Sequence, residues 1–291
     1  MVKFSIIIPV YNEGEGVKDT IEDLKDFLEK SELKALYEII IVDDGSTDGT
    51  SEILNKISGI RLIKHKKNKG YGAAIKTGVK NSENDYICIK DADGTYPKEA
   101  IKDLLSFMPE YDMAVGARRG ETIKSQSLRN FAKFFLILLV KILTGIKVPD
   151  LNSGLRVFKK NLFNEYEHLF PEGFSLTTTI TVCSIASDRS VKYLPIDYYP
   201  RKGSSKIHPI TDTYNFFIII LRTVLYFKPL KILMPIGLGL IFLSAAIAIF
   251  SGLFLEKILD TTTAIIFIGG VQIFILALVA DLIVNKFKKN E

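Results

Sequence analysis

The chain has 291 residues, enough for one large domain or two ordinary ones. Its net charge of +5 is modest and its basic residues are not clustered, so we expect no nucleic-acid partner. A mild basic excess suits lipid phosphate or a membrane surface instead. Apolar residues make up 47% of the chain, and the excess collects after about residue 213. The two cysteines, Cys88 and Cys183, lack metal-site spacing and predict reduced thiols in a cytosolic domain.

The first part of the chain alternates predicted strands and helices. Residues 3–10 and 37–42 are almost continuously apolar, which is typical of strands in a parallel sheet that is covered on both faces. The helix between them carries an apolar stripe formed by Val17, Ile21, Leu24 and Leu28. Further strands are predicted at 60–64, 86–90, 113–119, 157–158 and 192–199. This alternation predicts a doubly wound α/β sheet, in which ligands bind beyond the carboxyl ends of the strands.

Acidic residues follow three of these predicted strands: Glu13, then Asp43 with Asp44, then Asp91 with Asp93. The last pair is the most informative, because residues i and i+2 of an extended segment point the same way. Two carboxylates that leave most positions to water and phosphate are typical of Mg²⁺ or Mn²⁺ bound to a nucleotide diphosphate. The alternative is a polar turn that closes a strand. Three acidic clusters at one sheet edge favour the metal site.

Two later segments combine basic residues with apolar or small ones. Residues of about 129–145 predict an amphipathic helix in the membrane interface, with a buried core helix as the alternative. Its basic stripe consists of Arg129, Lys133 and Lys141. Arg201, Lys202 and Lys206 surround small residues, which predicts a phosphate-binding loop or a mobile lid, with a solvated basic loop as the alternative.

Two long apolar runs lie near the end of the chain, at about 232–255 and 263–284. The first has 24 consecutive uncharged residues. At about 1.5 Å per residue they span roughly 36 Å, enough to cross the hydrocarbon core. Lysines flank both outer ends, which predicts that those ends face the cytosol. Asp281, near a helix end, is a candidate either for an interfacial position or for contact with a partner chain.

We therefore expect three parts: a cytosolic catalytic domain at 1–211, a juxtamembrane interfacial helix at 212–228 and a transmembrane hairpin at 229–291. The predicted location is a cytoplasmic or endoplasmic-reticulum-type membrane, with a multi-pass anchor and the catalytic domain in the cytosol.

Four motifs in order resemble those of family 2 glycosyltransferases, which have a GT-A-type nucleotide-sugar-binding fold. They are Pro9-Val10-Tyr11-Asn12-Glu13, Val42-Asp43-Asp44-Gly45-Ser46, Asn68-Lys69-Gly70 and Asp91-Ala92-Asp93-Gly94. Later motifs are similar, more narrowly, to the dolichyl- and undecaprenyl-phosphate (polyprenyl-phosphate) glycosyltransferases. These are Gly116-Ala117-Arg118, Asp150-x-x-Ser153-Gly154-x-Arg156, Arg201-x-Gly203-x-Ser205-Lys206 and the terminal hairpin. The resemblance covers essentially the whole chain.

The resemblance implies a membrane-bound inverting hexosyltransferase that moves one sugar from a nucleoside-diphosphate sugar to polyprenyl phosphate. It implies that the donor is held by Pro9, Tyr11, Glu13, Asp43, Asp44, Gly70, Asp91, Ala92 and Asp93. Asp91 and Asp93 would also bind Mg²⁺ or Mn²⁺. The acceptor phosphate would be held by Arg118, Arg129, Arg201 and Lys206. The implied catalytic set is Asp91, Asp93, Arg118 and Arg201.

Two departures from the mannosyl branch of this family bear on the donor. Thr95 stands where that branch often has Gln, and residues 175–181 lack its acidic side chains. Both favour a UDP-glucose or UDP-N-acetylhexosamine donor over GDP-mannose. A phosphate acceptor is already anionic at pH 7, so it needs positioning more than a general base. Asp150 is a candidate either for a base or for the residue that orients an arginine.

Two other functions compete with this hypothesis. A processive polysaccharide synthase uses a Gln-x-x-Arg-Trp signature, and this chain has no tryptophan. A catalytically inactive, membrane-anchored nucleotide-sugar-binding scaffold is disfavoured by the intact pair Asp91 and Asp93. The sequence leaves open the nucleotide, the sugar, dolichyl against undecaprenyl phosphate, the pathway, and a monomer against a homo-oligomer. The three histidines, His65, His168 and His208, are predicted to be structural or on the surface.

Overall fold

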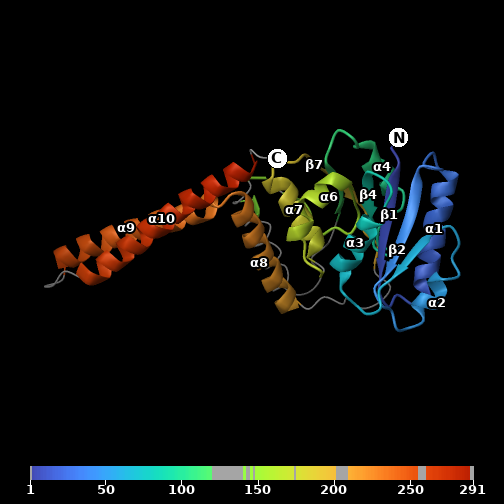
Figure 1. The fold of residues 1–291 in the computed structure, drawn as a ribbon, viewed down its shortest axis with the longest axis horizontal. Coiled ribbons are helices and arrows are strands. Elements are labelled where there is room, and N and C mark those ends of the chain that lie inside the picture. The colour runs from blue at the N-terminus through green and yellow to red at the C-terminus, as the bar shows by residue number, and fades with distance from the viewer. Residues whose placement is uncertain are drawn as a thin grey trace. The chain divides into compact units, whose positions relative to one another are not determined.

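The structure is a computed structural model that describes residues 2–119, 140–141, 145–146, 148–173, 175–200, 209–254 and 260–288 (Figure 1). The chain divides into two compact units. One comprises residues 1–142 and 146–220, and the other comprises 143–145 and 221–291. Most of the predicted interfacial helix at 129–145 lies outside the described residues. Arg129, Arg201 and Lys206 lie outside them as well.

A seven-stranded sheet forms the centre of the first unit, in the order β3-β2-β1-β4-β6-β5-β7. Its strands are β1 (Phe4–Val10), β2 (Tyr37–Asp43), β3 (Arg61–Lys64), β4 (Tyr86–Ile89), β5 (Met113–Arg118), β6 (Arg156–Lys159) and β7 (Val191–Ile196). Strand β6 runs antiparallel to β4 and β5, and the other adjacent pairs are parallel. The predicted α/β class with a mostly parallel sheet is confirmed.

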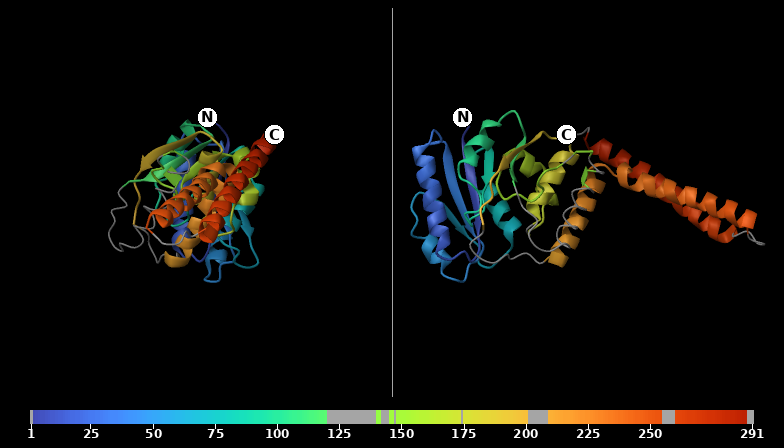
Figure 2. Two further views of the ribbon diagram at one scale, coloured as in Figure 1. Left: turned by 90° about the vertical axis from the view of Figure 1, so that its left-hand side faces the viewer. Right: turned by 180° about the vertical axis from the view of Figure 1, so that it is seen from behind.

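Helices cover both faces of this sheet (Figures 1 and 2). On one face, α1 (Gly16–Lys30) and α4 (Ala100–Ser106) pack against alternate residues of the central strands, such as Phe4 and Ile6. On the other face, α3 (Tyr71–Lys80) packs against Ile40 and Val42. Because neighbouring residues of one strand meet different helices, all seven residues of β1 are buried. This double coverage is the physical reason for the unbroken apolar strands.

The remaining helices of the first unit are α2 (Thr50–Leu54), α6 (Lys160–Tyr166) followed by a 3₁₀ turn at Glu167–Leu169, and α7 (Leu176–Ala186). Helix α8 (Pro209–Phe227) crosses the division between the units at residue 220. The residues of α7 are all buried, and this helix contacts α3.

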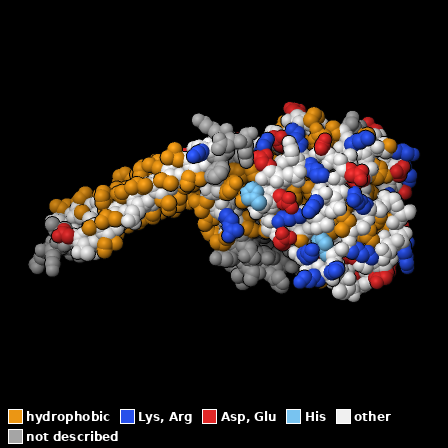
Figure 3. Space-filling model, viewed as in Figure 1, with side chains coloured by type: hydrophobic (Ala, Val, Ile, Leu, Met, Phe, Trp, Pro, Cys, Tyr) orange, Lys and Arg blue, Asp and Glu red, His pale blue; other side chains and the backbone are white. Residues whose placement is uncertain are grey.

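The second unit is a hairpin of two long helices, α9 (Leu230–Phe254) and α10 (Asp260–Lys288). They approach each other closely at two glycines: a Cβ at Gly237 would lie 2.9 Å from Phe274 N, and one at Gly270 would lie 2.9 Å from Gly237 O. Both helices are long and apolar enough to cross a membrane. Large apolar side chains face outward, with Leu253 and Phe254 each 72% exposed. Figure 3 shows apolar side chains covering the visible face of this hairpin.

Candidate active site

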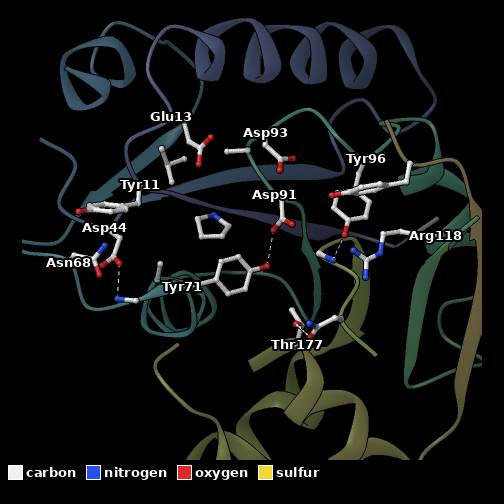
Figure 4. Close-up of a pocket in the computed structure, with 18 residues that line it drawn as sticks. Tyr11, Glu13, Asp44, Asn68, Tyr71, Asp91, Asp93, Tyr96, Arg118 and Thr177 are labelled. Carbon is white, nitrogen blue, oxygen red and sulfur yellow. Dashed lines mark hydrogen bonds between the residues drawn. The ribbon is translucent and has the colours of Figure 1, made fainter. Parts of the chain in front are cut away.

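A pocket of about 300 Å³ opens in the first unit beyond the carboxyl ends of β1, β2 and β4 (Figure 4). Strands β2 and β4 lie on either side of β1, so the strand order reverses at β1, and open α/β sheets bind ligands at such a point. All but one of the residues predicted to hold the donor line this pocket: Pro9, Tyr11, Glu13, Asp44, Gly70, Asp91, Ala92 and Asp93. Arg118 lines it as well.

The exception is Asp43, although it is the neighbour of Asp44. Its carboxylate accepts a hydrogen bond from the backbone N–H of Ser46 at 3.0 Å and another from the hydroxyl of Ser51. The side chain is 1% exposed. Asp43 therefore holds the turn between β2 and α2, and it does not line the pocket.

Asp44 lines the pocket, yet its carboxylate is also satisfied by the chain. Oδ2 accepts the backbone N–H of Gly70 at 2.7 Å, and Oδ1 accepts that of Lys69 at 2.9 Å. His65 Nδ1 lies 2.6 Å from Oδ1, and its Nε2 lies 2.9 Å from Thr77 Oγ1. Facing a carboxylate, Nδ1 carries the ring proton and donates it. Asp44 thus ties the end of β2 to the loop that opens α3.

Asp91 and Asp93 directly follow β4 and line the pocket. The Tyr71 hydroxyl donates to Asp91 Oδ1 at 2.8 Å. The backbone N–H and hydroxyl of Thr95 donate to Asp93 Oδ1, at 3.1 and 2.7 Å. Enclosure in the pocket and the nearby charge of Asp93 raise the pKa of Asp91 to about 6. Burial and a neighbouring like charge therefore both disfavour the ionised form of Asp91.

This donor set fits a divalent cation. Carboxylate oxygens are the ligands that Mg²⁺ and Mn²⁺ prefer, and a cation offsets both the burial and the repulsion from Asp93 that raise the pKa of Asp91. Among the described residues, no three His, Cys, Asp or Glu side chains are placed to hold a metal ion together. A cation at Asp91 and Asp93 would therefore complete its coordination with oxygens of a ligand and of water.

The register between β4 and β6 places Gly154 opposite Asp91. Ile89 of β4 pairs with Arg156 of β6, and the same antiparallel register carried two residues further sets Asp91 against Gly154. A Cβ at Gly154 would lie 1.9 Å from Asp91 Oδ2. The backbone N–H of Gly154 donates to the Tyr96 hydroxyl at 2.7 Å. Any side chain at this position would collide with the carboxylate of Asp91.

Arg118, at the end of β5, brings a cation to the pocket. Its Nε and one terminal nitrogen donate to the two carboxylate oxygens of Asp150, at 2.7 and 3.0 Å. Its guanidinium carbon lies 5.3 Å from the centre of the Tyr198 ring. Of the two roles left open for Asp150, this bidentate geometry favours the one that orients an arginine.

Several residues that line the pocket have no counterpart in the sequence-based prediction: Tyr71, Tyr96, Asn152, Thr177 and Tyr198. They come from the start of α3, the turn after β4, the loop before β6, the start of α7 and the segment after β7. The sequence did hold a signal for Tyr71, which directly follows Gly70 at the predicted helix start.

A nucleotide-sized pocket at the switch point of a mostly parallel sheet, with an acid pair beside it, defines the GT-A-like class of α/β folds. Comparison with known proteins agrees. Residues 5–167 match the family described as Glycosyl transferase family 2, and residues 228–285 match the GtrB C-terminal hairpin. The chain therefore belongs to glycosyl transferase family 2.

Individual relatives extend this result. A dolichyl-phosphate beta-glucosyltransferase of Dictyostelium discoideum is 32% identical over 55% of this chain and 54% of that protein. An undecaprenyl-phosphate 4-deoxy-4-formamido-L-arabinose transferase of Pseudomonas fluorescens is 27% identical over 84% of this chain and 72% of that protein. For three matched relatives, the chain spans 50%, 54% and 63% of their own length.

The fold is shared with a solved glucosyl-3-phosphoglycerate synthase from Mycobacterium tuberculosis, crystallised with Mn²⁺, UDP-glucose and phosphoglyceric acid. The TM-score is 0.60 at 15% identity, and the match covers 77% of this chain and 80% of that one.

Proposed function

We propose that this protein is a membrane-bound, metal-dependent hexosyltransferase that moves a single sugar from a nucleoside-diphosphate sugar to polyprenyl phosphate. The observation that carries the proposal is the meeting of an acid pair, Asp91 and Asp93, with an oriented cation, Arg118, in one pocket. The printed names of the Dictyostelium and Pseudomonas relatives support a polyprenyl-phosphate acceptor.

The donor half of the reaction uses the acid pair. Asp91 and Asp93 would hold Mg²⁺ or Mn²⁺, and such an ion neutralises the charge that develops on the departing nucleoside diphosphate. Tyr71 holds Asp91 in place through its hydroxyl, and Gly154 leaves the space that this carboxylate occupies. Tyr11, Glu13 and Asp44, at the other strand ends, would contact the nucleoside.

The acceptor half uses the arginine. The second pKa of a phosphate monoester is near 6, so at pH 7 polyprenyl phosphate is already a nucleophile and needs no strong base. Arg118, aligned by Asp150, would hold this phosphate near the anomeric carbon. Displacement by the phosphate oxygen forms its bond to the anomeric carbon as the bond to the diphosphate breaks, which inverts the configuration. Arg129, Arg201 and Lys206 remain predicted acceptor ligands outside the described residues.

The hairpin supports a membrane-bound enzyme, as a lipid acceptor requires. Helices α9 and α10 are long and apolar enough to cross a membrane, and lysines flank the outer ends of the hairpin. Under the positive-inside rule this arrangement favours a cytosolic catalytic unit. We favour UDP-glucose or a UDP-N-acetylhexosamine as the donor, with GDP-mannose as the alternative.

The test is incubation of the detergent-solubilised full-length protein with Mn²⁺ and single UDP- or GDP-sugars, with and without polyprenyl phosphate. The proposal predicts a chloroform-extractable, acid-labile lipid-linked monosaccharide that forms when acceptor, metal and one donor are all present. Water-soluble polymer would instead support a processive synthase. No turnover with any donor would support a binding scaffold.

A further inference from the structure

Two neutral polar residues that line the pocket, Asn152 and Thr177, form what we call its floor, and Figure 4 shows Thr177 below the acid pair. Asn152 Oδ1 accepts a hydrogen bond from the Thr177 hydroxyl at 3.3 Å and another from the hydroxyl of Thr178. Within the described parts of the chain, the amide nitrogen of Asn152 has no hydrogen-bond partner, although the residue lines the pocket. Its two N–H groups are therefore available to a bound molecule.

A fully buried arginine holds this floor together. Arg156 is 0% exposed, and one of its terminal nitrogens donates to Thr177 O at 2.8 Å and to Thr181 Oγ1 at 2.9 Å. The other terminal nitrogen donates to Ser153 O at 2.6 Å. These bonds join the loop that carries Asn152 to the start of α7, so Asn152 and Thr177 keep a fixed spacing. Groups fixed before a ligand arrives lose little entropy when they bind it.

If the proposed function holds, the order of the donor-binding and acceptor-binding residues along the pocket indicates which part of the substrate contacts Asn152 and Thr177. Figure 4 shows Tyr11, Asp44 and Asn68 on one side of the acid pair and Arg118 on the other, with Thr177 below. A diphosphate at the acid pair and an acceptor phosphate at Arg118 leave the transferred sugar between them.

Two other polar side chains in this stretch are already engaged within the chain. The Tyr96 hydroxyl accepts the N–H of Gly154, and both carboxylate oxygens of Asp150 are paired with Arg118. We infer that Asn152 and Thr177 form the subsite that recognises hydroxyl groups of the transferred sugar, and that this sugar is a neutral hexose.

The hydrogen-bonding groups of the subsite favour a neutral hexose. An amide offers N–H donors to sugar oxygens, and a threonine hydroxyl accepts from a sugar hydroxyl as well as donating. A uronic acid would add a negative charge to a pocket that already contains Glu13, Asp91 and Asp93 and that would also take up a diphosphate and an acceptor phosphate. A neutral sugar avoids this repulsion.

The test compares three single variants of the full-length protein in detergent. Thr177→Val removes the hydroxyl and keeps the shape, whereas Thr177→Ser keeps the hydroxyl. Thr179→Val is the matched control on the same helix, because the Thr179 hydroxyl donates to Ser175 O at 2.8 Å and does not line the pocket. Calorimetry with Mn²⁺ measures the affinity for UDP and for UDP-glucose, or for GDP and GDP-mannose if donor screening selects guanosine.

Thr177→Val should weaken binding of the nucleotide sugar about three- to tenfold, the size expected for one hydrogen bond, and leave binding of the nucleoside diphosphate unchanged. Thr177→Ser should restore the wild-type value, and Thr179→Val should not alter it. Should Thr177→Val not fold, Asn152→Ala removes the donors from a separate segment and should give the same selective loss.

An equal effect on nucleoside diphosphate and nucleotide sugar would overturn the inference, as would no effect on either. A raised KM for polyprenyl phosphate with unchanged donor binding would also overturn it and assign these groups to the acceptor phosphate. Failure of the wild-type protein to bind any nucleoside diphosphate would instead contradict the proposed function on which the subsite rests.

Discussion

Two pairs of acidic residues lie at the ends of parallel strands in this protein, and they differ in the hydrogen-bond donors and charges that surround them. After β2, Asp43 and Asp44 accept hydrogen bonds from backbone N–H groups, a serine hydroxyl and a histidine. After β4, Asp91 accepts one from Tyr71 and lies beside the charge of Asp93, which helps to raise its pKa to about 6.

The difference shows how one sequence pattern can serve two purposes. A carboxylate surrounded by donors of its own chain stabilises the fold and fixes a loop. A carboxylate held next to a like charge makes the unliganded protein less stable, and that deficit is recovered when a cation binds. The first pair shapes the pocket and the second pair is suited to hold a ligand in it.

The largest expected effect is on turnover. Asp91→Asn removes half of the charge that would hold the metal, so we expect the rate of sugar transfer to fall by about a thousandfold or more. Asp43→Asn should cost the rate far less, because Asp43 does not line the pocket. Initial rates at saturating Mn²⁺, corrected for folded protein, measure both. Similar losses for the two variants would remove the distinction between the pairs.

The next largest effect is expected when the space next to the Asp91 carboxylate is filled. Gly154→Ala places a methyl group 1.9 Å from Asp91 Oδ2, so the carboxylate or the loop must shift. We expect a loss of about ten- to a hundredfold in kcat/KM and weaker Mn²⁺ binding. Gly16→Ala is the control, because a Cβ there meets no atom within 4 Å. Wild-type metal affinity in Gly154→Ala would contradict the assigned contact.

Replacing an acid by its amide should change the free energy of unfolding in opposite directions for the two pairs. Asp44→Asn turns an N–H₂ group toward one of three N–H donors, which should lower the free energy of unfolding by about 2 kcal/mol. Asp91→Asn should raise it by on the order of 1 kcal/mol at pH 7.5 without metal, because it removes an unfavourable charge. Thermal denaturation in detergent with a metal chelator measures both, and shifts of the same sign would refute the comparison.

The pH dependence of the Asp91→Asn effect follows from the raised pKa of Asp91. The folded state binds the proton of Asp91 more tightly than the unfolded state does, since the pKa rises from 3.8 to about 6. Stability from this group is therefore present below pH 4 and is lost as the pH rises to about 6. The advantage of Asp91→Asn should vanish at pH 4, which a Tm series from pH 4 to 8 checks.

The smallest effect concerns the support of Asp91. Tyr71→Phe removes the hydroxyl that donates to Asp91 Oδ1. With this hydrogen bond lost, the carboxylate is less well positioned, and we expect Mn²⁺ affinity to fall about three- to tenfold. The matched control is Tyr37→Phe. It removes a tyrosine hydroxyl that donates a hydrogen bond to the exposed Glu29, away from the pocket. Equal Mn²⁺ affinity in all three proteins would show that Tyr71 does not position the acid.

Much of the fold was predictable, because strands covered on both faces are runs of consecutive apolar residues in the sequence. The predicted strands at 3–10, 37–42 and 86–90 correspond to β1, β2 and β4, and the apolar stripe of Val17 to Leu28 is the buried face of α1. The antiparallel placement of β6 between β4 and β5 was not predicted, since pairing between distant segments leaves no local pattern.

The candidate site was predictable in part, for a related reason. Strand ends can be read from the sequence, so residues such as Glu13 and Asp91 could be assigned to one edge of the sheet. The sequence could not separate Asp43 from Asp44, because one residue of offset turns a side chain to the opposite side. Asn152 and Thr177 were missed because they meet only through the long-range packing of α7 against the loop before β6.

The most direct test of the account is calorimetric titration of Mn²⁺ into the full-length protein with UDP or GDP present, compared between wild type, Asp91→Asn and Asp93→Asn. The account predicts one Mn²⁺ site that depends on the nucleotide in the wild-type protein and is lost in both variants. Unchanged Mn²⁺ binding in either variant would show that this acid pair is not the metal site.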